Sequence, residues 1–142
     1  FIGAILRSAE VLPVARGGSI EQKRDVVRRS EELLNRGQAL ALFPEGKRDH
    51  TGVLLRGKAG AGVLASRTGA LLLPVAITGT EHLHGFGWLF TRPRIDVKIG
   101  TPVALPQTDG PISRPTAARL AEEVMTHIAD LLPPEKRGPY AG

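Results

Sequence analysis

Apolar and polar positions along the chain follow helical spacing in some segments and strand-like spacing in others. Residues 2–9 place apolar side chains on one face of a short helix, and residues 11–14 then predict a brief strand. Ser19 and Gln22 have the spacing of a capping box, which predicts the start of a helix that Gly37 ends. The apolar face of that helix is formed by Ile20, Val26, Val27, Leu33 and Leu34.

The opposite face of this first long helix is basic. It carries Lys23, Arg24, Arg28 and Arg29. Two interpretations remain open: a solvated surface, or contact with an anionic lipid or ligand.

Two further helices are predicted closer to the C-terminus. The first lies in "VLLRGKAGAGVLASRTG", which predicts a turn and then a small-residue helix that ends at Gly69. The second runs from about Thr116 to Leu132 with one apolar face. The last residues, 133–142, have the composition of a disordered tail, so the folded domain is expected to span residues 1–132.

The strand predictions complete the fold class. Residues 39–43, "ALALF", predict a compact buried strand, and the near-continuous apolar run at 70–79 predicts a central strand covered on both faces. Residues 95–100 alternate like a half-exposed strand, and 101–106 are expected to be an extended edge piece. Because helices and strands alternate, we expect an α/β fold with a mostly parallel central sheet and helices on both faces.

Composition narrows the range of partners. The 142 residues, 42% of them hydrophobic, are sufficient for one hydrophobic core, and the formal charge of +5 favours anionic partners such as phosphorylated metabolites, acidic lipid headgroups or nucleic acid. With only 4% aromatic residues, base-stacking platforms have little to be built from, so no nucleic-acid partner is expected.

The absence of cysteine excludes disulfides and thiolate metal sites and is consistent with an intracellular location. No apolar run approaches the roughly 18 residues of a membrane span. The chain opens at Phe1 in mid-pattern, so we expect the natural N-terminus to lie upstream.

Two glycine patterns resemble nucleotide-binding motifs without matching them. Residues 52–59 have the glycine and lysine spacing of a phosphate-binding loop, but Ala59 stands where a magnesium-binding hydroxyl is required. Residues 60–65, "GAGVLA", with Glu81 further along, satisfy a short dinucleotide-binding pattern that often arises by chance. Small residues in a helix also permit close packing, which is the simpler interpretation.

A charged turn follows the predicted strand at 39–43. Ligands of open α/β folds bind where strands end, and the turn places Glu45, Gly46, Lys47 and Arg48 at that position. Arg48 suits bidentate contact with a phosphate, Lys47 adds a point charge, and Gly46 permits close approach of the backbone. The alternative is a surface turn in which Glu45 and Arg48 pair with each other.

The charged turn and the segments around it resemble the sequence blocks of a known enzyme family. The segment "FPEGKRD" resembles the F-P-E-G-T-R-S block of the glycerolipid acyltransferases, the family of 1-acylglycerol-3-phosphate acyltransferases. "VLPVARG", "LLRGKAGAGVLA" and "LLLPVAI" are similar to neighbouring blocks of that family, in the same order, over about residues 5–80. By this resemblance Arg16, Glu45, Gly46 and Arg48 fall on substrate-binding positions. Lys47 replaces the usual threonine and adds charge of the same sign.

The resemblance implies transfer of a fatty acyl group from acyl-CoA or acyl carrier protein to a lysophosphatidic-acid-like acceptor in phospholipid biosynthesis, without a further cofactor or a metal. In the family, a histidine of an H-x-x-x-x-D block is the general base. That block is not found here, because His50, His82, His84 and His127 each lack an aspartate five positions on. None of these histidines is expected to replace the base, and His82 and His84 are not expected to hold a metal.

These observations give one leading function and one alternative. We expect the full-length protein to be an acyltransferase at the cytoplasmic face of a membrane, held peripherally or through an N-terminal segment, with its catalytic block upstream of Phe1. We expect this segment alone to be largely inactive. The alternative is a non-catalytic domain of the same fold that binds phosphate or lipid.

Overall fold

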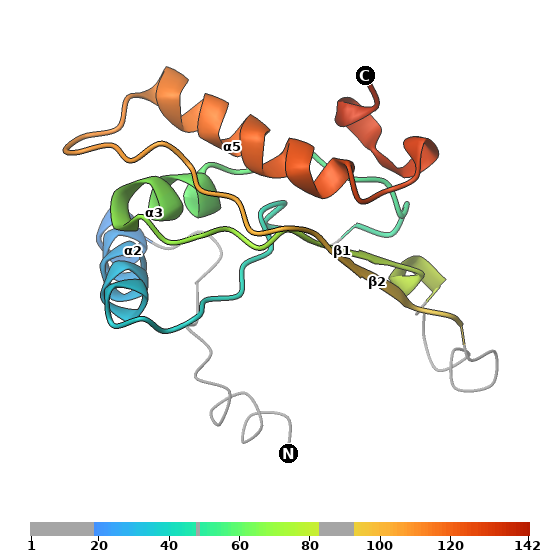
Figure 1. Cartoon of the computed structure of the whole chain (residues 1–142), viewed down its shortest axis with the longest axis horizontal. Coiled ribbons are helices and arrows are strands. Elements are labelled where there is room, and N and C mark those ends of the chain that lie inside the picture. The colour runs from blue at the N-terminus through green and yellow to red at the C-terminus, as the bar shows by residue number, and fades with distance from the viewer. Residues whose placement is uncertain (1–18, 48, 83–92) are drawn as a thin grey trace, which may run out of the picture. The chain divides into compact units, whose positions relative to one another are not determined.

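The computed structural model describes residues 19–47, 49–82 and 93–142. The chain divides into two units, Phe1–Leu40 and Ala41–Gly142. Figure 1 shows the elements along the chain. Within the described ranges, no helix is both long and apolar enough to span a bilayer.

The described part of the first unit, residues 19–40, contains helix α2, Ile20–Asn35. The predicted capping box is confirmed, because the Ser19 hydroxyl accepts a hydrogen bond from the Gln22 backbone and the Gln22 side chain accepts one from the Ser19 N–H. The basic face of α2 is partly neutralised: Arg28 pairs with Asp25 at 2.6 Å and with Glu32 at 2.6 Å. The Arg28 guanidinium also holds the pKa of Asp25 below its usual value. These contacts within one helix favour the interpretation of this face as solvated surface.

The second unit contains an antiparallel strand pair. Strands β1, Val75–Thr78, and β2, Asp96–Ile99, pair with Val75 opposite Ile99 and Thr78 opposite Asp96. An isolated bridge between Leu72 and Val103 continues the pairing in the same antiparallel sense. The short helix η1, Thr80–His82, follows β1. A mixed helix and strand fold is therefore confirmed, whereas the pair seen within the described residues is antiparallel and not parallel.

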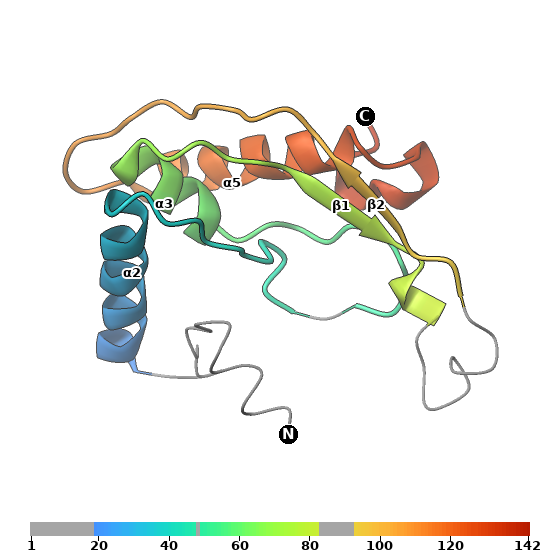
Figure 2. The same cartoon turned by 60° about the horizontal axis from the view of Figure 1, so that its bottom comes forward.

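Two helices pack against each other beside this strand pair. Helix α3, Gly60–Thr68, ends at Gly69 as predicted. Helix α5, Arg114–Ala129, contacts α3, β1 and the short helix η3, Gly138–Tyr140 (Figure 2). Leu120 and Val124 of α5 pack with Ala61 and Ala65 of α3 in one apolar cluster. Further along α5, Met125 and Ala129 pack with Leu54, Ala76 and Leu132 in a second one. Helix α5 is therefore the element that the two halves of the core share.

The C-terminal segment differs from the expected disordered tail. Residues 133–142 form two short helices, η2 at Pro134–Lys136 and η3 at Gly138–Tyr140. The Leu54 N–H donates to the carbonyl of Lys136 at 2.8 Å, and the Gly57 N–H donates to the Tyr140 hydroxyl at 3.0 Å. These partners lie about eighty positions earlier, so local composition does not reveal the order of this segment.

Two strand predictions are also corrected. Residues 39–43 form no strand, and Phe43 is 81% exposed, so the charged turn does not follow a buried strand. Among the residues that the structure describes, one face of the run at 70–79 is covered: Ala76 is buried against α5, whereas Leu73, Val75 and Ile77 are exposed. An apolar run favours burial of both faces of a strand, but each face is buried only where another element packs against it.

Candidate anion-binding site

The charged turn begins with a β-turn at residues 43–46, and Lys47 follows it directly. The N–H of Gly46 donates to the carbonyl of Phe43 at 3.0 Å, which closes a β-turn with Pro44 at its second position. Gly46 itself has φ +65°, a conformation that residues with a side chain rarely adopt. The turn therefore requires both the proline and the glycine that the sequence provides.

Glu45 fastens the turn to the chain that follows it. Its carboxylate accepts a hydrogen bond of 2.9 Å from the N–H of Leu55, and the Lys58 N–H donates to the carbonyl of Pro44 at 2.8 Å. These two bonds hold residues 55–58 against the turn. Glu45 is half-buried and has a defined partner in the backbone, so we assign it a positioning role.

The backbone of residues 54–58 is held from two directions. Leu55 and Lys58 donate to the turn, whereas Leu54 and Gly57 donate to the C-terminal segment at Lys136 and Tyr140. The charged turn is thus attached through this segment to the folded core of the second unit.

The predicted cations of the site are only partly described. Lys47 follows Gly46 directly and is exposed, so its ammonium is available to an anion. Arg16 and Arg48 lie outside the described residues, and their phosphate contacts stay predictions. The proposed pairing of Glu45 with Arg48 likewise stays untested, although Glu45 already has Leu55 as a partner.

Asp49 stabilises the segment that follows the charged turn. Its carboxylate accepts hydrogen bonds from both the backbone N–H and the hydroxyl of Thr51, and these contacts lower the pKa of Asp49 below its usual value. His50 lies between them and is exposed. Asp49 is therefore occupied in shaping the loop.

Lys58 is the residue of the site that the sequence analysis did not single out as a ligand. A Cβ atom placed on Gly46 would lie 2.7 Å from Cδ and 2.9 Å from Nζ of Lys58. The end of the Lys58 side chain therefore lies directly against the turn. The available signal is the lysine in "LLRGKA", which belongs both to the incomplete phosphate-loop spacing and to a block similar to the acyltransferase family.

A second charged contact lies at the end of β1. The Glu81 carboxylate pairs with the Lys136 ammonium at 2.5 Å and accepts the N–H of Gly79 at 2.8 Å. The hydrogen bond from Lys136 is the main cause that lowers the pKa of Glu81 to about 2. Gly52 leaves room for this pair, since a Cβ there would lie 2.9 Å from the Glu81 carboxyl carbon. Glu81 thus has a structural role, which is unlike the ribose contact of a dinucleotide site.

The glycines at 60–65 serve helix packing. A Cβ on Gly62 would lie 2.8 Å from the carbonyl oxygen of Leu120, so α3 and α5 approach closely at this position. Leu54, inside the phosphate-loop-like segment 52–59, is buried in the core.

Within the described ranges no group of three or more metal-ligating side chains is found. Of the other histidines, His127 lies in the last turn of α5, and His84 lies outside the described residues.

Comparison with known proteins agrees with the resemblance. The family model described as Acyltransferase matches residues 1–78. The chain is 35% identical over 79 residues to a chloroplastic 1-acyl-sn-glycerol-3-phosphate acyltransferase of Arabidopsis thaliana, covering 56% of this chain and 22% of that protein. It is 34% identical over 79 residues to a chloroplastic enzyme of the same name from Brassica napus, covering 56% of this chain and 23% of that protein.

The chain thus spans less than a quarter of the length of these relatives. No solved structure matches it. The family match covers the charged turn, the segment 54–58 that holds it, and strand β1. The chain belongs to the acyltransferase family.

Proposed function

We propose that the full-length protein transfers a fatty acyl group from acyl-CoA or acyl carrier protein to the free hydroxyl of a lysophosphatidic-acid-like acceptor. The relatives that carry a 1-acyl-sn-glycerol-3-phosphate acyltransferase name support this acceptor class. The observation that carries the proposal is the turn at 43–46, which exposes Lys47 and is held by Glu45.

In this proposal the turn binds the phosphate of the acceptor. Lys47 and Arg48 supply the positive charge, Gly46 permits close approach, and Arg16 keeps the phosphate role that the resemblance implies. A dianionic phosphate monoester fits a cationic turn better than a neutral headgroup does, because each ammonium or guanidinium makes a charge-assisted hydrogen bond.

The chemical step requires a general base. The base removes the proton of the acceptor hydroxyl, the oxygen attacks the thioester carbonyl, the C–S bond breaks, and the thiol leaves with a proton. We propose that an H-x-x-x-x-D pair outside the printed residues performs this role, since no histidine of this sequence has an aspartate at that spacing.

The setting we propose is an anionic membrane surface, reached peripherally or through a further segment of the protein, on its cytoplasmic side. The formal charge of +5 supports attraction to acidic headgroups and to acyl-CoA. The alternative of a binding domain without chemistry differs from this proposal in one measurable property, turnover.

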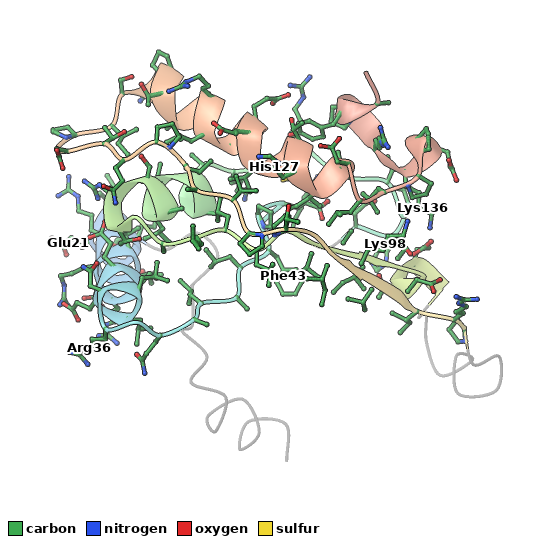
Figure 3. All side chains as sticks on the ribbon, viewed as in Figure 1. Glu21, Arg36, Phe43, Lys98, His127 and Lys136 are labelled. Carbon is green, nitrogen blue, oxygen red and sulfur yellow. The ribbon has the colours of Figure 1, made fainter. Side chains whose placement is uncertain are left out.

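The experiment is an acyl-transfer assay on the full-length protein with lysophosphatidate and, in separate reactions, acyl-CoA and acyl carrier protein. We expect turnover with at least one donor, and we expect Lys47→Met to raise KM for lysophosphatidate severalfold. Lys98→Met is the matched control, because Lys98 is also an exposed lysine but lies on β2 (Figure 3). Lysophosphatidate binding without turnover would favour the binding domain, and identical KM values for Lys47→Met and wild type would remove the turn from the site.

A further inference from the structure

We infer that Lys58 is a further binding residue of the anion site, whose ammonium contacts the acceptor phosphate together with Lys47. This inference rests on the proposed function, which assigns the phosphate to the turn at 43–46. It adds to the proposed phosphate site a residue that lies twelve positions after Gly46.

The first argument is position. Nζ of Lys58 lies 2.9 Å from the point where a Cβ of residue 46 would stand, and Cδ lies 2.7 Å from it. The main chain of Lys58 is fixed to the same turn by the 2.8 Å hydrogen bond from its N–H to Pro44. Both ends of this residue are therefore directed to the turn, and the missing side chain of Gly46 creates the space that the lysine uses.

The second argument is charge. Lys58 is exposed, and within the part of the chain that the structure describes it forms no ion pair. Helix α3 begins two residues later and carries no acidic residue in its first turn. Glu45, the acid within the turn at 43–46, directs its carboxylate to the Leu55 N–H. An unneutralised ammonium beside the positive end of a helix attracts an anion.

The third argument is preorganisation. Four backbone N–H groups of residues 54–58 donate hydrogen bonds, two to the turn and two to the C-terminal segment, and two of the four acceptors are side chains. The Lys58 backbone is thus fixed before any ligand arrives, so little backbone order has to be established on binding. An isolated surface lysine lacks this support.

The test uses the full-length protein and vesicles, so it does not depend on turnover. The probe is a phosphatidylcholine vesicle containing lysophosphatidate, a phosphate monoester. The comparison vesicle carries equal charge as phosphatidylglycerol, a phosphate diester. We expect wild type to prefer the lysophosphatidate vesicle, Lys58→Met and Lys58→Gln to weaken that preference roughly tenfold, and Lys58→Arg to retain most of it. Lys98→Met is the control for loss of one surface charge.

The outcomes separate this inference from the proposed function. If Lys47→Met weakens binding but both neutral variants of Lys58 bind like wild type, Lys58 is not a ligand and the proposed acceptor site stands. If wild type does not distinguish the two vesicles, the acceptor site itself is wrong, and the role of Lys58 fails with it. Equal loss in Lys58→Met and Lys98→Met would mean general surface attraction and would also overturn the inference. Thermal unfolding of each variant verifies that the fold is retained.

Discussion

The hydroxyl of Tyr140 accepts a hydrogen bond of 3.0 Å from the backbone N–H of Gly57, which joins the last turn of the chain to the segment behind the charged turn. Tyr140 also packs against the apolar cluster around Met125. The C-terminal residues are therefore part of the support of the candidate site.

Removal of this hydroxyl should destabilise the fold. We expect Tyr140→Phe to lower the free energy of unfolding by about 1 kcal/mol, because the partly buried Gly57 N–H loses its acceptor while the ring is kept. Urea unfolding measures the change. Hydrogen exchange should also quicken at Gly57, and exchange that is unchanged there would contradict the contact.

Glu45 offers a test of the clamp on the turn. We expect Glu45→Ala to cost about 1–2 kcal/mol, because the half-buried Leu55 N–H loses a charged acceptor. Glu45→Gln keeps an acceptor oxygen and should lose less than half of that amount. Equal stability of the two variants in urea would show that the hydrogen bond does not hold the turn.

The Glu81–Lys136 pair predicts a dependence on pH. The folded pKa of Glu81 is lowered to about 2, against 4.5 for the ordinary carboxyl, so its stabilising contribution is complete above about pH 4.5 and is lost as the pH falls toward 2. Glu81→Gln should remove this part of the acid sensitivity. The measurement is the difference in free energy of unfolding between wild type and variant from pH 7 to pH 3. A difference that is constant with pH would exclude the assigned shift.

The close approach of α3 and α5 predicts different effects of alanine at two glycines of α3. Gly62→Ala should destabilise by roughly 1–3 kcal/mol, because its Cβ would lie 2.8 Å from the carbonyl oxygen of Leu120. Gly60→Ala is the matched control on the same helix, since nothing lies within 4 Å of its added Cβ, and it should be neutral or slightly stabilising. Thermal unfolding distinguishes the two. Similar melting temperatures would mean that the helices are further apart.

Arg48 carries the strongest prediction for substrate binding. On the proposed function, we expect Arg48→Ala in the full-length protein to raise KM for lysophosphatidate roughly 10- to 100-fold, because it would remove the bidentate phosphate contact that we propose. KM for the acyl donor should change little, which serves as the internal control. An unchanged KM for lysophosphatidate would show that the phosphate role belongs to other residues.

Helices α2, α3 and α5 were predictable because their signals are local, whereas the helix predicted at 2–9 lies outside the described residues. Ser19 and Gln22 lie three positions apart and form the expected cap, and Gly69 ends α3 where the small-residue pattern stops. The strands were less predictable. The apolar run at 70–79 and the segment 39–43 show a tendency to bury, but whether a partner covers them depends on elements distant in the sequence.

The same difference between local and distant signals decides which parts of the candidate site were predictable. The turn at 43–46 was recognisable from its proline, glycine and charged residues. The contact of Lys58 with Gly46 was not, because it depends on a chain reversal between them. The order of residues 133–142 was missed for the same reason, since it comes from contacts with Leu54 and Gly57.

The uncovered face of the strand pair affects how this chain behaves in dilute buffer. Val75 lies opposite Ile99 and Ile77 opposite Val97, and all four are exposed. Such an apolar row favours association between copies. Asp96 and Lys98 alternate with it along β2, so they lie on the other face of the pair and do not interrupt the row. We therefore expect preparations of the chain to lose monodispersity as the concentration rises.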